Sequence, residues 1–174
     1  IEAGIKHVIC ADILKQELTQ IKQSAAISTA ELNVCDESQW QMLIKQTQDI
    51  HGSIDILVNN AGISLGTAID AEDYPALWHK SIAVLLTAHT LTIRASLPYL
   101  RQSEHPRILN IASTEALGAT KFGSPYTAAK SGVTGLTRSL AVELGDDAIT
   151  VNCVCPGPIN TGMTSAIPEE NKAI

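Results

Sequence analysis

The chain has 174 residues, enough to bury a hydrophobic core, and its 45% hydrophobic and 17% charged residues are typical of a globular domain. A net charge of −6 without a Lys and Arg cluster argues against nucleic-acid binding, and no apolar run is long enough to span a bilayer. We therefore expect one domain over residues 1–174, with neither a nucleic acid nor a membrane as partner.

Short apolar runs alternate along the chain with longer helical patterns. Strands that are apolar on both faces and alternate with helices are typical of a parallel sheet covered by helices, with right-handed crossovers. The sequence therefore predicts an α/β fold. In chain order we expect strand 7–11, helix 13–23, strand 30–34, helix 38–50, strand 54–60, helix 73–101, strand 107–113, helix 124–144 and strand 148–155.

Helix ends carry the expected signals. Asp36 and Ser38 are candidate N-caps of the second helix, and Ser124 with Pro125 begins the fourth. Gly145 follows the last apolar turn and suits a C-cap.

The four cysteines indicate packing rather than metal or disulfide chemistry. Cys10, Cys35, Cys153 and Cys155 lack C-x-x-C and zinc-finger spacing. Free cysteines are commonly buried, and Cys153 and Cys155 would point to the same side of a strand. We expect no metal site and, as the default, a reducing, cytoplasmic location.

Polar or glycine-rich turns follow four of the predicted strands. In open parallel sheets, ligands bind beyond the carboxyl ends of the strands, so functional groups should gather at that edge. The turns are Asp12, Asn60-Ala61-Gly62, Ser113 and Pro156-Gly157.

Tyr126 and Lys130, in "GSPYTAAKSG" (123–132), share one helix face at a spacing of four residues. An ammonium close to a phenol lowers the phenol pKa from its usual value near 10 and makes it a better acid/base at neutral pH. Alone, the short pattern favours the plainer interpretation, a packed tyrosine and a solvated lysine. Ser113, at the end of "NIAS", could share with Tyr126 a carbonyl oxygen that gains charge during reduction. Alternatively, it is a strand-terminal turn residue.

Four motifs stand together in the chain: "NNAG" (59–62), "NIAS" (110–113), "YTAAK" (126–130) and "PGPINT" (156–161), with "LAVELG" (140–145) in addition. In type, order and spacing they resemble those of the short-chain dehydrogenase/reductase (SDR) family. The resemblance implies a Rossmann-like doubly wound parallel sheet with helices on both faces. It also implies an oxidoreductase that transfers a hydride between NAD(P) and a secondary alcohol or ketone, that is, an enzyme acting on CH–OH groups (EC 1.1.1.-).

The resemblance implies a role for each matched residue. Tyr126 would be the general acid/base, Ser113 would polarise the carbonyl, and Lys130 would lower the tyrosine pKa and bind the nicotinamide ribose. The remaining cofactor contacts would be Asn60, Ala61 and Gly62 on the adenosine side, Asn33 and Val34 at adenine, and Pro156, Gly157, Ile159 and Thr161 at the nicotinamide carboxamide.

Asp12 bears on the choice of cofactor. An acidic residue at the end of this strand can accept hydrogen bonds from the ribose hydroxyls of NAD and would repel the 2′-phosphate of NADP. We therefore expect NAD rather than NADP, although a purely local capping role of Asp12 is compatible with either.

The chain departs from the family pattern in two ways. It has no T-G-x-x-x-G-x-G turn to bind pyrophosphate, and the family's first and last strands are missing. Strands 7–11 and 54–60 should then face each other unpaired, and we interpret residues 1–174 as a fragment of a longer SDR domain. Leu85 also stands where many members carry an asparagine that supports a water in the proton relay.

Two alternatives remain at this point. One is an NADP-dependent 3-oxoacyl thioester reductase, against which Asp12 argues. The other is a catalytically silent relative kept for binding or assembly, against which Ser113, Tyr126 and Lys130 argue. By resemblance, we expect a small alcohol or ketone as substrate and a homodimer or homotetramer in the full-length form.

Overall fold

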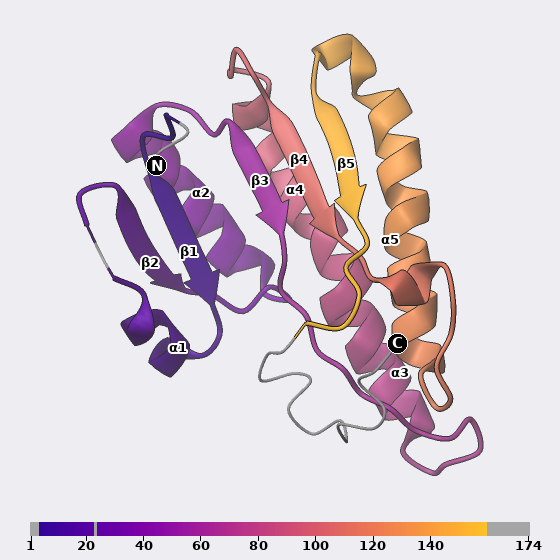
Figure 1. Cartoon of the computed structure of the whole chain (residues 1–174). Helices are drawn as coiled ribbons and strands as arrows, with labels where there is room; N and C mark the ends of the chain where they lie inside the picture. Colours follow the sequence, from indigo (N-terminus) through magenta and orange to yellow (C-terminus); the bar gives the residue numbers. More distant parts are fainter. Residues whose placement is uncertain (1–3, 23, 160–174) are drawn as a thin grey trace.

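The structure is a computed structural model that describes residues 4–22 and 24–159 (Figure 1). It confirms the predicted α/β class with parallel strands. The strands are β1 (Val8–Asp12), β2 (Ile27–Glu31), β3 (Ile56–Asn59), β4 (Arg107–Ile111) and β5 (Thr150–Val154). The helices are α1 (Lys15–Gln20), α2 (Glu37–His51), α3 (Tyr74–Ile82), the π-helix η1 (Ala83–Thr87), α4 (Ala88–Leu100), α5 (Ser124–Glu143), and the 3-10 turns η2 (Thr114–Ala116) and η3 (Gly145–Asp147).

The strands form two parallel sheets rather than one. β1 pairs with β2, and β4 lies between β3 and β5. β1 and β3 are neighbours in Figure 1 but belong to different sheets, which confirms the prediction that they do not pair. On β3, Ile56 and Val58 are 52% and 49% exposed, whereas Leu57 and Asn59 are buried. One face of β3 is therefore covered and the other is open.

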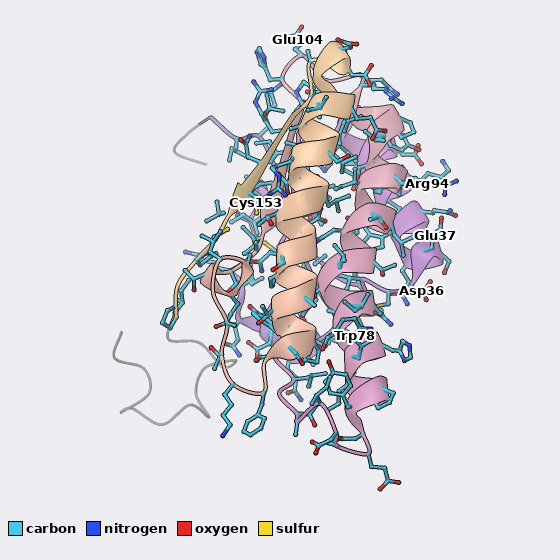
Figure 2. All side chains as sticks on the ribbon, turned by 90° about the vertical axis from the view of Figure 1, so that its right-hand side faces the viewer. Asp36, Glu37, Trp78, Arg94, Glu104 and Cys153 are labelled. Atoms are coloured by element: carbon cyan, nitrogen blue, oxygen red, sulfur yellow. The ribbon has the colours of Figure 1, made fainter. Side chains whose placement is uncertain are left out.

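Helices α2, α4 and α5 cover one face of the strands (Figure 1), and α5 runs beside the continuous helix formed by α3, η1 and α4 (Figure 2). The small residues of α5 allow this close approach. Ala129 is fully buried, and a Cβ added at Gly132 would lie 2.7 Å from Leu86 Cδ2. The hydrophobic core lies between β3–β5 and these helices, and consists of Leu57, Ile93, Leu100, Ile108, Leu144, Ile149 and Val151.

The local predictions need four corrections. β2 ends three residues earlier than predicted, because its pairing with β1 begins at Ile27 opposite Val8. Asp36 caps α2 by accepting from the backbone of Ser38 and Gln39, so Ser38 is not the cap. α5 begins at Ser124 with Pro125 as predicted, but it ends with Leu144 as C-cap, and Gly145 starts η3.

The fourth correction concerns the cysteines. All four are free, and Cys35 is exposed rather than packed, because it follows β2 in the loop before α2. Within the described part of the chain, no helix combines the length and the hydropathy that a membrane span requires.

Candidate active site

The carboxyl ends of the strands bring most of the predicted site residues to one edge of the molecule (Figure 1). Asp12 is the last residue of β1, Asn60 follows β3, and Ser113 lies two residues after β4. The segment around Ser113 is joined to the end of β5, because Ala112 N donates to Val154 O (2.8 Å) and Thr114 N donates to Pro156 O (2.9 Å). The end of β4 and the start of the "PGP" turn are therefore fixed to each other.

Tyr126 and Lys130 lie together on α5, as the spacing predicted. The Lys130 Nζ is 5.7 Å from the centroid of the Tyr126 ring and donates to Ile111 O at 2.7 Å, at the end of β4. Lys130 is only 3% exposed, and burial lowers its pKa. The charges of Cys153 and Cys155 act on the Lys130 pKa in the opposite direction. The pair is thus a buried cation beside a partly buried phenol, not a solvated lysine on a helix surface.

Ser113 follows β4 in an extended conformation and is the N-cap of η2. Its Oγ accepts a hydrogen bond from Glu115 N at 3.2 Å, which orients the hydroxyl oxygen. The side chain is partly buried. The hydroxyl hydrogen takes no part in this bond, so Ser113 can donate to an incoming oxygen atom.

Glu115 organises the loop between Ser113 and Tyr126, a role that no motif indicated. Its carboxylate accepts from Thr120 N (2.9 Å) and from Thr127 Oγ1 (2.9 Å). Thr127 is the neighbour of Tyr126 in the first turn of α5, so Glu115 ties the loop to the turn that carries the phenol. The only signal in the sequence was an acidic residue in a loop rich in small and polar residues.

The residues predicted for the adenosine side lie in turns after β1, β2 and β3. The exposed Asp12 carboxylate accepts from Leu14 N through Oδ1 (2.8 Å). Asn33 N donates to Gln39 Oε1 (2.8 Å), and Val34 O accepts from Trp40 Nε1 (3.2 Å), so the start of α2 holds this turn in place. Of the others, Asn60, Ala61, Gly157 and Ile159 are exposed, Gly62 and Pro156 are partly buried, and Thr161 lies outside the described residues.

A chain of buried hydrogen bonds crosses the layers directly below this edge. Thr92 Oγ1 of α4 donates to Asn59 Oδ1 (2.6 Å), and Asn59 Nδ2 donates to Asn110 Oδ1 (2.9 Å). Asn110 Nδ2 donates to Thr137 Oγ1 of α5 (3.0 Å), whose hydroxyl donates to the Val133 carbonyl (2.8 Å). These asparagines open "NNAG" and "NIAS", and a polar residue inside an apolar strand was the signal that could have found them.

Leu85 and His89 occupy the buried side of the helix that faces this network. Leu85 is fully buried in η1 and offers no hydrogen-bonding group. His89, in the first turn of α4, is 3% exposed, and desolvation together with the Lys130 charge lowers its pKa to about 4. The Asn59 backbone carbonyl acts in the opposite direction but does not reach hydrogen-bond geometry. His89 is therefore neutral at physiological pH.

The free energy of unfolding should decrease as the pH falls from 6.5 to 4. In this pH window the histidine of the unfolded chain binds a proton, whereas buried His89 in the folded protein does not. The free energy of unfolding therefore falls by about 2–3 kcal/mol between pH 6.5 and pH 4. Urea denaturation at several pH values measures it. His89→Leu should lose this part of the pH dependence, whereas His51→Leu, at an exposed site on α2, should keep it. Equal pH dependence in the wild type and His89→Leu would contradict a buried, neutral ring.

Among the described residues, no group of three or more His, Cys, Asp or Glu side chains is arranged to hold a metal ion. The chemistry that the arrangement can support is proton transfer at Tyr126 beside a fixed positive charge, with Ser113 as an additional hydrogen-bond donor.

Comparison with protein families gives a match to the short chain dehydrogenase model over residues 1–172. The (2S)-[(R)-hydroxy(phenyl)methyl]succinyl-CoA dehydrogenase subunit BbsD of Thauera aromatica is 45% identical over 130 residues, which cover 75% of this chain and 52% of that protein. The D-beta-hydroxybutyrate dehydrogenase of Cupriavidus necator is 37% identical over 154 residues, which cover 88% of this chain and 59% of that protein. The chain thus spans little more than half the length of these relatives.

Solved structures share the same fold. ElxO with NADP bound has a TM-score of 0.82 at 30% identity, over 90% of this chain and 65% of that one. Carveol dehydrogenase from Mycobacterium avium in complex with NAD has a TM-score of 0.74 at 33% identity, over 79% of this chain and 50% of that one.

Proposed function

Since the chain belongs to the short-chain dehydrogenase family, we propose that its protein is an oxidoreductase that interconverts a secondary alcohol and a ketone with a nicotinamide cofactor. The observation that carries the proposal is the contact between Tyr126 and Lys130, in which a buried ammonium lies 5.7 Å from the phenol ring. A fixed cation at this distance stabilises a phenolate, and a phenol that ionises more easily is a better general base.

In the proposed mechanism, Tyr126 takes the hydroxyl proton of the alcohol during oxidation and returns it to the carbonyl oxygen during reduction. Ser113 donates a hydrogen bond to the same oxygen and stabilises its developing negative charge. Lys130 places a positive charge beside the phenol, and Ile111 O holds the ammonium in place. The nicotinamide cofactor, when bound, supplies or accepts the hydride.

The strand ends fit a dinucleotide. The Asp12 carboxylate is exposed, and among the described residues only its Oδ1 has a hydrogen bond, so Oδ2 is available to a ribose hydroxyl. Lys130 would bind the nicotinamide ribose. The other contacts would be Asn33, Val34, Asn60, Ala61 and Gly62 on the adenosine side and Pro156, Gly157, Ile159 and Thr161 near the carboxamide. Because the Asp12 charge would repel a 2′-phosphate, we propose NAD as the preferred cofactor.

The names of the relatives bear on the substrate. One acts on a hydroxylated succinyl-CoA and the other on D-beta-hydroxybutyrate, so hydroxylated acids and their thioesters are the first substrates to test. The thioester reductase and the catalytically silent protein remain the alternative functions. We further propose that the full-length protein is a homodimer or homotetramer and is located in the cytoplasm.

A turnover and binding experiment tests the function and the cofactor together. The purified full-length protein is assayed with 3-hydroxybutyrate, a 3-hydroxyacyl-CoA and a panel of other secondary alcohols, and formation of reduced nicotinamide is followed by absorbance. We expect turnover with at least one alcohol and a lower Kd for NADH than for NADPH. A lower Kd for NADPH would contradict the role of Asp12. Tight cofactor binding without turnover of any alcohol would instead support the silent binding protein.

A further inference from the structure

His89 is the most unusual buried group near the site. His89 is only 3% exposed, yet neither Nδ1 nor Nε2 has a hydrogen-bond partner among the described residues. Buried polar groups almost always have a partner, because leaving one unpaired costs about 1–3 kcal/mol. An unpaired histidine in this position therefore needs an explanation beyond packing.

The position of His89 points to Lys130 as the partner. Thr92, one turn later on α4, is bonded to Asn59, so this face of α4 lies against the end of β3. On the other side of the same strand ends, Lys130 Nζ donates to Ile111 O of β4, and Asn110, the residue before Ile111, is the strand partner of Asn59. The Lys130 charge also contributes to lowering the His89 pKa. His89 and the Lys130 ammonium therefore both lie at the ends of the paired strands β3 and β4.

Lys130 has donors to spare. An ammonium carries three N–H groups, and among the described residues the only hydrogen bond of Lys130 Nζ is the one to Ile111 O. The ammonium is also out of contact with bulk water, since the residue is 3% exposed. The Lys130 ammonium lacks a second acceptor, and the His89 imidazole lacks a donor, so a hydrogen bond between them would satisfy both.

We propose that His89 is a positioning residue for Lys130, in which an unprotonated ring nitrogen accepts a hydrogen bond from the ammonium. The lysine forms this bond by rotation about the last bonds of its side chain. Together with Ile111 O, this second acceptor holds the lysine charged beside Tyr126. The ring is suited to the role because it stays neutral, as a charged imidazole would repel the ammonium. The other titratable groups that act on Lys130 are Cys153 of β5 and Cys155, the residue that follows β5.

The consequence for catalysis rests on the proposed function, whereas the contact itself does not. Without the acceptor, the charged form of Lys130 is less stable and the lysine loses its proton at a lower pH. Tyr126 then loses the positive field that favours its phenolate, and the alkaline limb of the kcat/KM profile moves to lower pH.

The test compares His89→Leu, which has no acceptor, with His89→Gln, which keeps one. The Lys130 pKa is measured by NMR of protein labelled at the lysine side chains, with the signal assigned through Lys130→Met. We expect His89→Leu to lower the Lys130 pKa by about one unit, the value of one hydrogen bond to a charged group. His89→Gln should stay close to the wild type, and His51→Leu on α2 controls for loss of a histidine elsewhere. An unchanged Lys130 pKa in folded His89→Leu would overturn the proposal, because a merely structural histidine would not move it.

A second measurement avoids His89 variants altogether and decides the matter even if they fail to fold. The ¹⁵N resonances of His89 are compared between the wild type and Lys130→Met. A nitrogen that accepts a hydrogen bond from the ammonium should change its shift when the donor is removed, and no change would overturn the contact. Both measurements need neither cofactor nor substrate. Absence of turnover would therefore count against the proposed function and leave the His89–Lys130 contact to be judged by NMR.

Discussion

Tyr126→Phe should lower kcat by about 10²–10⁴-fold, the usual contribution of a general acid/base. The substitution removes only the hydroxyl, so the ring should keep its place 5.7 Å from Lys130 Nζ and α5 should fold as before. Proton transfer from the alcohol would then lack its acceptor. Steady-state turnover of the substrate found in the alcohol panel measures the loss, and cofactor binding by fluorescence should change little.

The matched control is Tyr99→Phe. Tyr99 lies near the carboxyl end of α4, next to Leu100 of the hydrophobic core and away from the ends of β4 and β5 that hold the site. It should retain the turnover of the wild type. Wild-type turnover in Tyr126→Phe would exclude the proposed role of the phenol, and an equal loss in both variants would indicate a general effect of removing a tyrosine hydroxyl.

Asn110→Leu should lower the free energy of unfolding by about 3–4 kcal/mol. Asn110 is fully buried and links the layers, accepting from Asn59 Nδ2 and donating to Thr137 Oγ1. Leucine removes both hydrogen bonds and leaves the Asn59 amide buried without an acceptor. Urea denaturation followed by circular dichroism measures the loss.

Two further variants sharpen this result. Asn152→Leu makes the same change at an exposed position of β5 and should alter the free energy of unfolding little. The double variant Asn59→Leu/Asn110→Leu should cost less than the sum of the two single variants, because the second substitution removes the amide that the first left unpaired. Strict additivity would contradict a direct coupling between Asn59 and Asn110.

Much of the fold and part of the site could be predicted from local sequence patterns. The alternation of apolar runs with helical patterns predicted the α/β class, and the Asp36 cap and the Ser124-Pro125 helix start were confirmed. Helical spacing placed Tyr126 and Lys130 on one face, where the structure has them in contact. The position of β2 was wrong by three residues, because the pairing of Ile27 with Val8, not the apolar content of the segment, decides where that strand begins.

The sequence by itself determined what local spacing controls: the class of fold, the helix starts, the shared face of Tyr126 and Lys130, and the turns where strands end. Only the tertiary structure decided what depends on residues far apart in the chain. It buried Lys130 against the end of β4 and joined Asn59 to Asn110. It also buried His89, whose two ring nitrogens have no hydrogen-bond partner among the described residues. The physical reason is that burial and long-range hydrogen bonding arise only when the layers pack together. The periodicity within one helix or strand does not specify which side chain of another element will contact it.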